Sequence, residues 1–419
     1  MTLSRRFRPL WVRLLALLAV VGPGIITANA DNDAGGVTTY SVAGAHYGYS
    51  LLWIMPLVAV ALIIVQEMSA RLGVVTGKGL ADLIREAMGV RATAVIVGIV
   101  VLANLGNAVS EFAGVAASME ILGVSKYISV PIVAVLVWVL ILKADYKVVE
   151  RVFLVASAIY LAYVASGIMA KPSWPAVAQA FVTPSFSFDA GFVTIVVTAI
   201  GTTIAPWMQF YQQASIVDKG LKVTDIGFER IDVIIGSIFA VFVASFIIIA
   251  CAATLHTSGV RIETAKDAAL ALRPLAGSYA STLFAVGLLN ASVFAAAILP
   301  LSTAYLVCEA FGWEAGLNRY IREAPVFFGL YTAFIVIGAA VILLPIKSLV
   351  QAMLISQTLN GVLLPVVLIV MLRLINDRRL MGRFVNGRIF NALAYATVAI
   401  LILLTAILLI TTFFPGVLG

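Results

Sequence analysis

The sequence carries very little charge for its length. Of its 419 residues, 11% are Asp, Glu, Lys or Arg and 62% are hydrophobic, and the mean hydropathy is +1.09. A soluble chain would carry about 25% charged residues, so the composition excludes a water-soluble globular protein. The apolar runs are roughly 20 residues long, whereas membrane β-strands are roughly 10 residues long and alternate in polarity. The sequence therefore predicts an all-α polytopic membrane protein.

Cysteine and histidine are also scarce. Cys251 and Cys308 both lie inside apolar runs, and the absence of a CxxC pair excludes a disulfide framework and a thiolate metal site. His46 and His256 are far apart in the sequence and fit no zinc spacing. No GxSxG or Walker motif occurs, and the glycines of 73–79 lack P-loop spacing. These absences predict that the chain is not an enzyme and binds no cofactor.

Eleven apolar segments are long enough to cross a membrane. The first, third, sixth and eighth exceed one bilayer thickness, which predicts a tilt or a break. The segments are 15–45, 50–72, 93–121, 128–145, 151–170, 190–216, 231–255, 279–309, 325–346, 348–373 and 389–414.

The longest loops suggest how these segments are grouped. The connection 171–189 separates five spans in 15–170 from five in 190–373, and 389–414 is an additional eleventh helix. A second loop, 256–278, contains an amphipathic stretch at 264–273 that predicts a short surface helix. We expect one transmembrane transporter domain over 1–419, without a separate soluble domain.

Basic residues are distributed unevenly between the two sets of loops. If the N-terminus is cytoplasmic, 21 of the 27 Lys and Arg residues lie on the cytoplasmic side and six on the other. This asymmetry predicts a multi-pass inner (plasma) membrane protein with a cytoplasmic N-terminus and an extracytoplasmic C-terminus. It also explains the net charge of +7 without nucleic acid. The basic, apolar start resembles a signal peptide but has no cleavage-like region, so we interpret it as a retained first span.

The stretch 31–36, Asp-Asn-Asp-Ala-Gly-Gly, places two carboxylates and a glycine pair inside the first apolar segment. Carboxylates in lipid need a partner or a polar cavity, and a helix interrupted there frees carbonyl groups that a cation can satisfy. No Lys or Arg lies in the apolar centre of spans 1 or 6, so a cation ligand is favoured at Asp33 over a packing role. Asp31 could reach the same ion only if the backbone unwinds, so its role stays open.

The sixth apolar segment has a matching interruption. Gly201 to Trp207 surround Pro206, which removes a backbone donor, and paired breaks in two halves are a pointer to a transport site. Thr202 and the freed carbonyls supply oxygen ligands, and Gln357 on span 10 can reach the same cavity or form an interhelical hydrogen bond. Glu111 on span 3 either lines a polar path or pairs with a basic residue. Oxygen ligands favour hard cations such as Mg²⁺, Mn²⁺ or Ca²⁺.

At these residues the chain resembles the NRAMP family of divalent-metal transporters. The stretches 22–36, 43–53 and 69–78 carry the resemblance, which covers most of the chain. The family implies eleven or twelve helices in a LeuT-like 5+5 inverted repeat. The metal would lie between broken helices 1 and 6, at Asp33, the carbonyls of Ala30 and Thr202, and Gln357.

The departures from the family signatures narrow the interpretation. An Asn ligand of the family is Gly36 here, the selective Met thioether is Ala205, and a His linked to proton movement is Trp207. Asn104 replaces a Glu of the proton path. These changes resemble the NRAMP-related magnesium transporter branch, with space at Ala205 and Gly36 for a partly hydrated ion.

The resulting expectation is a Mg²⁺ importer that also carries Mn²⁺ by alternating access without proton coupling. A potential of 100 mV favours entry of a divalent ion by roughly 4.6 kcal/mol, so uncoupled uptake is energetically reasonable. The alternatives are a proton-coupled Mn²⁺/Fe²⁺ transporter of the same family, or an amino-acid or organic-cation carrier of the same fold. The expected partners are the divalent ion and the lipid bilayer, with no obligate protein partner.

Overall fold

The computed structural model describes residues 32–143, 160–317 and 319–414. The regular secondary structure of these ranges is helical. The main helices are α3 (Ala34–Tyr47), α4 (Ile54–Thr76), α5 (Leu80–Ile121), α6 (Lys126–Lys143), α8 (Leu161–Met169), α9 (Trp174–Val182), α10 (Ala190–Thr203), α11 (Pro206–Asp218), α12 (Ile226–Cys251), α13 (Ala265–Ala269), α14 (Arg273–Ala276), α15 (Ala280–Phe311), α16 (Pro325–Leu343), α17 (Leu349–Ile375), α18 (Arg378–Met381) and α19 (Arg388–Phe413).

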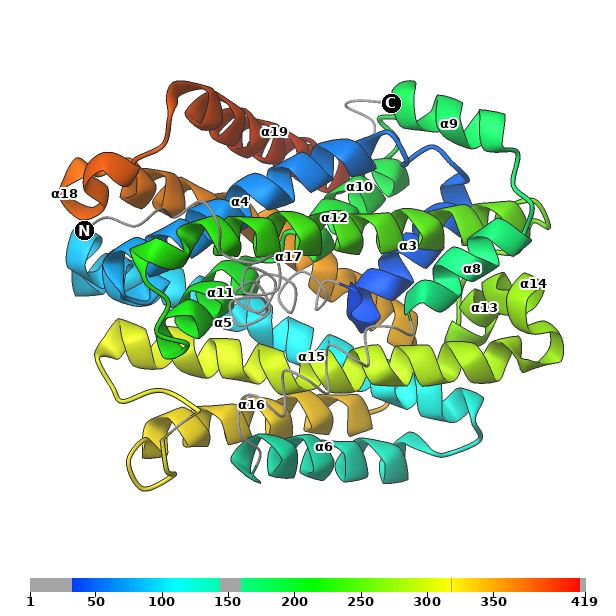
Figure 1. Ribbon diagram of the computed structural model, residues 1–419. Helices are drawn as coiled ribbons and strands as arrows, with labels where there is room; N and C mark the ends of the chain where they lie inside the picture. Colours follow the sequence, from blue (N-terminus) through cyan, green and yellow to red (C-terminus); the bar gives the residue numbers. More distant parts are fainter. Residues whose placement is uncertain (1–31, 144–159, 318, 415–419) are drawn as a thin grey trace, which may run out of the picture.

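Nine helical segments of the described ranges are long and apolar enough to cross a membrane. They correspond to nine of the eleven predicted segments. The other two, 15–45 and 151–170, fall partly on residues outside the described ranges and are represented by α3 and α8. The all-helical polytopic prediction is confirmed. The long helices run from one end of the molecule to the other (Figure 1), and the loops gather at the two ends.

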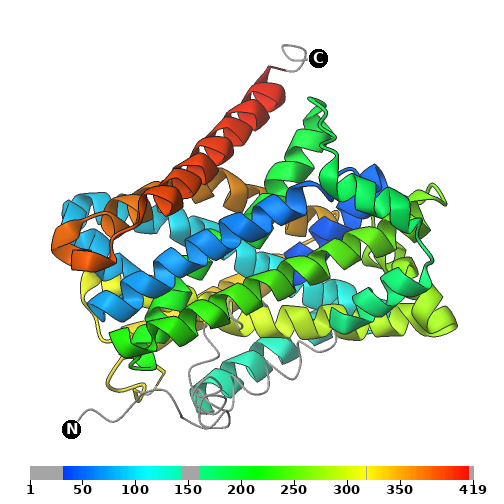
Figure 2. The ribbon, with the colours of Figure 1, turned by 45° about the horizontal axis from the view of Figure 1, so that its top comes forward.

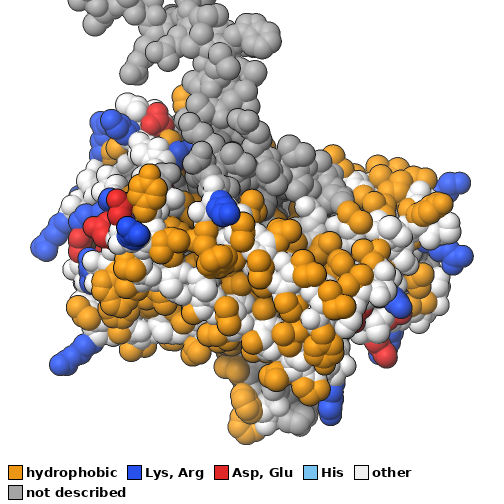
Figure 3. All heavy atoms as spheres, turned by 90° about the horizontal axis from the view of Figure 1, so that it is seen from below, with side chains coloured by type: hydrophobic (Ala, Val, Ile, Leu, Met, Phe, Trp, Pro, Cys, Tyr) orange, Lys and Arg blue, Asp and Glu red, His pale blue; other side chains and the backbone are white. Residues whose placement is uncertain are grey.

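On the face drawn in Figure 3, an apolar surface lies between two charged ends. In Figure 3, Lys and Arg side chains gather at the ends and hydrophobic side chains cover the surface between them. Ile132, Val336 and Leu403 each expose more than half of their surface. Such exposure of large apolar side chains is stable in lipid and costly in water. Helix α19 extends along the outside of the bundle (Figure 2), where it adds apolar surface to the molecule.

Two predicted loops contain helices. The connection 171–189 includes α9, which begins with Pro175 near its first turn, the position where proline costs no hydrogen bond. The predicted surface helix at 264–273 is present as α13, a 3₁₀ turn and α14. Thr264 and Asp267 form a capping box at its start, which satisfies otherwise unpaired backbone donors. These short helices lie at the same end of the molecule in Figure 1.

The sixth predicted span is broken in the middle. Helix α10 ends at Thr203 and α11 begins at Pro206, with Ile204 and Ala205 in non-helical conformations between them. In a continuous helix the carbonyl group of Thr202 would accept from the nitrogen of residue 206, and proline has no N–H to donate. The break therefore follows directly from the sequence at Pro206.

Glycines bring two helices into backbone contact beside this break. A Cβ atom on Gly201 of α10 would lie 2.3 Å from the nitrogen of Gly361 on α17, and one on Gly361 would lie 2.4 Å from the Val197 carbonyl oxygen. Small residues allow this approach in membranes, where packing rather than the hydrophobic effect holds helices together. The contact fixes α17, and with it Gln357, against the broken span.

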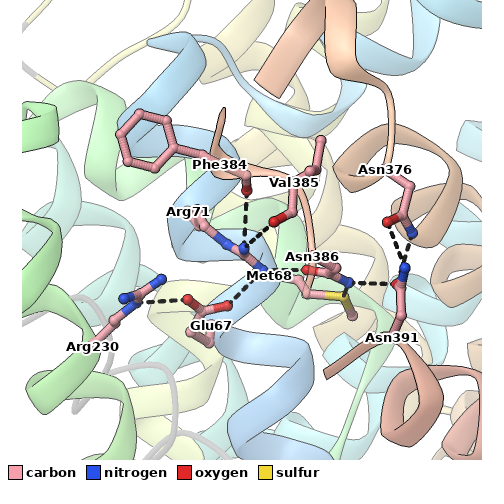
Figure 4. Close-up of polar contacts among 9 residues, drawn as sticks. All are labelled: Glu67, Met68, Arg71, Arg230, Asn376, Phe384, Val385, Asn386 and Asn391. Atoms are coloured by element: carbon pink, nitrogen blue, oxygen red, sulfur yellow. Dashed lines mark hydrogen bonds and ion pairs between the residues drawn. The ribbon is translucent and has the colours of Figure 1, made fainter. Parts of the chain in front are cut away.

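A buried arginine ties α4 to the segment before α19 (Figure 4). Arg71 forms an ion pair with Glu67 at 3.0 Å, donates to the Phe384 carbonyl oxygen at 2.9 Å, and bonds the Asn386 side chain. Glu67 also pairs with Arg230 of α12 at 2.8 Å. This gives the family-like stretch 69–78 a structural role, because its arginine joins α4 to the segment before α19, while the Glu67 partner of that arginine joins α4 to α12.

Candidate metal site

Asp33 caps the N-terminus of α3, and the glycine pair Gly35 and Gly36 lies in the first turn of that helix. Its side chain is 3% exposed and accepts a hydrogen bond from the Gly36 nitrogen at 2.5 Å. An acidic N-cap is favoured because it satisfies a free backbone donor and faces the positive end of the helix dipole. Part of the carboxylate's burial cost is therefore offset by α3 itself.

A second buried carboxylate shares this helix end. Glu111 of α5 is fully buried, and one of its oxygens accepts from the Ala34 nitrogen at 3.3 Å, so both carboxylates lie at the start of α3. The other Glu111 oxygen, Oε1, has no hydrogen-bond partner among the residues that the structure describes. No ion pair to Glu111 occurs among the described residues. The predicted alternative in which it pairs with a basic residue thus finds no support there.

Gln357 of α17 completes the surroundings of Asp33. Its Nε2 atom lies 3.4 and 3.3 Å from the two Asp33 carboxylate oxygens. Gly35 makes this approach possible, because a Cβ atom there would lie 2.0 Å from the same Nε2. The predicted interhelical hydrogen bond of Gln357 is therefore present, between α17 and α3, and its predicted contact with a cation stays a prediction.

A chain of amides continues from Gln357 away from the site. Asn360 donates 2.8 Å hydrogen bonds to Gln357 Oε1 and Asn107 Oδ1. Asn107 returns a 3.2 Å bond to Asn360 Oδ1 and accepts from Ser356 at 2.8 Å. All four side chains are nearly inaccessible to solvent. The sequence analysis identified the polar residues on spans 3 and 10 but not their direct connection across the helices.

The broken span contributes Thr202 and Ala205. Thr202 Oγ1 is buried and has no hydrogen-bond partner within the described ranges, and Pro206 cannot donate to the Thr202 carbonyl oxygen. Tyr40 of α3 and Thr203 share a 2.7 Å hydrogen bond, which holds the end of α10 against α3. Ala205 is 2% exposed and caps α11 without a side-chain hydrogen bond.

The local chemistry suits a hard cation. Two adjacent carboxylates cannot both ionise in a low-dielectric interior without a compensating positive charge. The N-terminal end of α3 supplies about half of an elementary positive charge. This compensates only part of the negative charge of two carboxylates, so a bound cation is favourable. Buried oxygens without partners are costly, and a metal ion satisfies them. Oxygen atoms of this kind are the ligands of Mg²⁺, Mn²⁺ and Ca²⁺.

The predicted site residues divide into three groups. The structure brings Asp33, Gly36 and Gln357 together, with Thr202 and Ala205 on the neighbouring broken span. Gly36 contributes only its backbone N–H group, which donates a hydrogen bond to the Asp33 carboxylate. Ala30 and Asp31 lie outside the described residues.

The two histidines, distant in the sequence, both bond backbone beside the end of α3. His256 bonds the Ala45 carbonyl oxygen and His46 accepts from the Ile262 nitrogen. These two hydrogen bonds connect the C-terminal end of α3 to the segment 256–262. Within the described ranges, no group of three or more His, Cys, Asp or Glu side chains is arranged to hold a metal.

A cavity of about 750 Å³ opens at the end of the molecule that carries α13. It is lined by the last turn of α5, the loop before α13 and the first turns of α17. Leu354 at its inner side precedes Gln357 by three residues, about one helical turn. The cavity lies on the face that the basic-residue count predicts to be extracytoplasmic, and none of the described candidate site residues lines it.

Comparison with known proteins gives a family match over most of the chain. The model of the Nramp family, described as natural resistance-associated macrophage protein-like, matches residues 24–411. Two relatives bear the name divalent metal cation transporter MntH. The one from Ralstonia nicotianae is 30% identical over 94% of this chain and 90% of its own length. The one from Granulibacter bethesdensis is 28% identical over 94% of this chain and 89% of its own length.

Solved structures share the fold. The crystal structure of an Eremococcus coleocola manganese transporter in complex with a bis-isothiourea compound has a TM-score of 0.80 and 22% identity, covering 99% of this chain and 93% of that one. Mhp1, a nucleobase-cation-symport-1 family transporter, has a TM-score of 0.58 and 16% identity, with 94% coverage of each chain. The relatives are all named as transporters, in agreement with the prediction that the chain is not an enzyme.

Proposed function

Since the chain belongs to the Nramp family, we propose that it carries divalent metal cations across the membrane, with Mn²⁺ among its substrates. The observation that supports this most is the buried pair of Asp33 and Glu111 at one helix end. The names of the relatives point the same way, and they support the manganese alternative better than magnesium.

In this proposal the cation binds between α3 and the break of α10 and α11. Asp33 provides the charged ligand. The Thr202 carbonyl, left without a donor by Pro206, provides a second oxygen, and Gln357 provides a third after its amide turns. The family resemblance assigns a carbonyl ligand to Ala30. Asp31 is not assigned by the resemblance and would reach the ion only where the backbone unwinds. Gly36 and Ala205 leave space for bound water.

Uptake into proteoliposomes tests the proposal. The purified full chain is reconstituted with a metal-sensitive fluorophore inside, and Mn²⁺ is added outside. Wild type should quench the fluorophore, and Asp33→Ala should reduce the initial rate to the level of empty liposomes. Thr194→Val, which removes an exposed hydroxyl on α10, is the control and should transport normally. Equal rates for wild type and Asp33→Ala would remove Asp33 from the site.

Magnesium is a second candidate substrate because of one feature of the broken span. Ala205 stands where a soft sulfur ligand would favour transition metals, and the remaining donors are oxygens, which Mg²⁺ prefers. Competition separates the candidates. If Mg²⁺ is carried, millimolar Mg²⁺ should slow Mn²⁺ uptake, and a magnesium-sensitive dye should report its entry. An unchanged Mn²⁺ rate with no dye response excludes magnesium.

Coupling to protons depends on the same carboxyl pair. A divalent ion bound at Asp33 brings two positive charges beside Glu111 and would displace any proton that the two carboxyl groups share, which supports exchange with protons over the uncoupled interpretation from the sequence. A pH dye inside the liposomes distinguishes the two. Acidification that follows Mn²⁺ uptake supports proton coupling, and a constant internal pH supports uncoupled transport.

The arrangement of the repeats is also a proposal. We assign 15–170 and 190–373 to two inverted five-helix halves and 389–414 to an additional helix. The break at Pro206 and the start of α3 at Asp33 occupy corresponding positions in these halves. The N-terminus is placed in the cytoplasm by the charge count, and labelling of single cysteines from either side of the membrane tests that assignment.

A further inference from the structure

The amide chain behind Asp33 has a defined direction. An ionised carboxylate only accepts hydrogen bonds, so Gln357 must turn its Nε2 atom toward Asp33 and its Oε1 atom away. Asn360 must then present Nδ2 to that oxygen, as it does at 2.8 Å. The direction passes on to Asn107, whose Oδ1 accepts from Asn360 and from Ser356. Asp33 therefore sets the orientation of three amides.

A cation at Asp33 requires the opposite direction. The Nε2 group of Gln357 carries partial positive charge and would face the ion unfavourably, whereas its oxygen is a good ligand for a hard cation. If Gln357 turns over, its nitrogen faces the donor of Asn360. Asn360 must turn as well, and then Asn107.

Ser356 makes the reversal possible. A hydroxyl group can donate or accept, so Ser356 can donate to Asn107 in one state and accept from it in the other. In the reversed chain the Nδ2 group of Asn107 donates to Asn360 and to Ser356, and Asn360 accepts from Gln357. Every hydrogen bond of the chain then has a counterpart with exchanged donor and acceptor, and no buried amide loses its partner.

We propose that Gln357, Asn360, Asn107 and Ser356 form a reversible hydrogen-bond chain that lets Gln357 exchange its bond to Asp33 for a bond to the cation. This inference rests on the proposed divalent-cation site at Asp33. Asn360, Asn107 and Ser356 are positioning residues, because they act on the ion through Gln357. Their role is to keep the amide satisfied in both states, so that cation entry does not leave a buried donor unpaired.

Ser356 provides the sharpest test, because its hydroxyl group is needed as a hydrogen-bond partner in the cation-bound state and not in the ion-free state. Without its hydroxyl, the Asn107 oxygen still accepts from Asn360 in the ion-free state. In the cation-bound state an Asn107 N–H group would lack an acceptor. A buried unpaired donor is costly, so Ser356→Ala should weaken Mn²⁺ binding about tenfold, or about 1.4 kcal/mol, while the ion-free protein keeps its stability.

Titration calorimetry of the purified full chain with MnCl₂ measures this effect. The proteins are wild type, Ser356→Ala, Gln357→Ala and the double variant, a cycle that isolates the interaction between the two positions. Thr358→Val is the control, since this hydroxyl lies on the same helix but bonds Leu354 and Thr198 outside the chain. We expect a tenfold higher Kd for Ser356→Ala, less than a twofold further change when Ser356→Ala is added to Gln357→Ala, and a wild-type Kd for Thr358→Val.

Two results overturn the inference while the proposed function stands. One is a Ser356→Ala Kd within twofold of wild type. The other is an undiminished effect in the Gln357→Ala background, which would mean that Ser356 acts through packing. Absence of Mn²⁺ binding by wild type, or binding unchanged in Asp33→Ala, overturns the proposed function itself and this inference with it.

Discussion

The backbone contact between α10 and α17 gives a prediction with a worked magnitude. In Gly201→Ala, the new Cβ would lie 2.3 Å from the Gly361 nitrogen, 2.5 Å from the Gln357 carbonyl oxygen and 2.6 Å from the Gly361 Cα. Nonbonded heavy atoms pack at about 3.5–4.0 Å. Backbone atoms cannot turn aside as a side chain can, so the two helices must separate by roughly 1 Å to restore ordinary contact.

This separation has consequences for stability and for the site. Overpacking costs about 1–3 kcal/mol, against which alanine recovers up to about 1 kcal/mol of helix propensity. The Gln357 bonds to Asp33 are already 3.3 and 3.4 Å long, so a shift of α17 away from α10 breaks them. We therefore expect Gly201→Ala to lower both the unfolding temperature and the rate of Mn²⁺ uptake.

The assay compares thermal unfolding in detergent and initial uptake in proteoliposomes for wild type, Gly201→Ala and Gly98→Ala. Gly98 is the matched control, because it lies within α5 and a Cβ there would meet no atom within 4 Å. Gly98→Ala should equal or exceed wild-type stability and transport normally. If Gly201→Ala behaves like Gly98→Ala in both measurements, α10 and α17 are not in backbone contact and the reasoning is refuted.

Three further predictions follow from the site and from the buried ion pair. Arg71→Ala should destabilise the chain by about 1–3 kcal/mol, because it removes one of the two cationic partners of the buried Glu67 and leaves the Phe384 carbonyl group and the Asn386 side chain without their donor, and Arg71→Lys should not restore stability since it lacks the planar fork; thermal unfolding in detergent checks both. Glu111→Gln removes one of the two carboxyl groups at the start of α3 and should weaken Mn²⁺ binding about tenfold, or about 1.4 kcal/mol; calorimetry measures the affinity, and a Kd within twofold of wild type would show that the charge of Glu111 does not attract the cation. Ala205→Met should add a soft ligand and make Cd²⁺ a stronger competitor of Mn²⁺ uptake by about tenfold, or 1.4 kcal/mol; competition equal to wild type would show that residue 205 does not face the ion.

Much of the fold was predictable because lipid imposes a simple rule. Apolar segments of roughly 20 residues must be helices, since each backbone donor and acceptor has to be satisfied within its own segment. Pro206 likewise predicted a break from its own chemistry. The helix within 171–189 was not predicted, because its periodicity is short and its position depends on packing against the rest of the molecule.

The candidate site was predictable in part for a related reason. A carboxylate in an apolar segment, such as Asp33, is conspicuous in any sequence of this kind. The partners of Glu111 could not be predicted, because 77 residues separate it from Ala34 and no local pattern records that they meet. The link from Asn107 to Asn360, which spans 253 residues, was hidden for the same reason.

The sequence by itself determined that this protein lies in a membrane, that it is helical, and that a carboxylate and a broken span lie at its centre. These properties depend on the cost of placing each residue in lipid, which is local. Only the tertiary structure decided that Asp33 and Glu111 share one helix end, that Gly35 and Gly201 admit Gln357, and that three amides connect in one direction. Those features depend on which distant surfaces pack together, and the composition of a single segment does not contain that information.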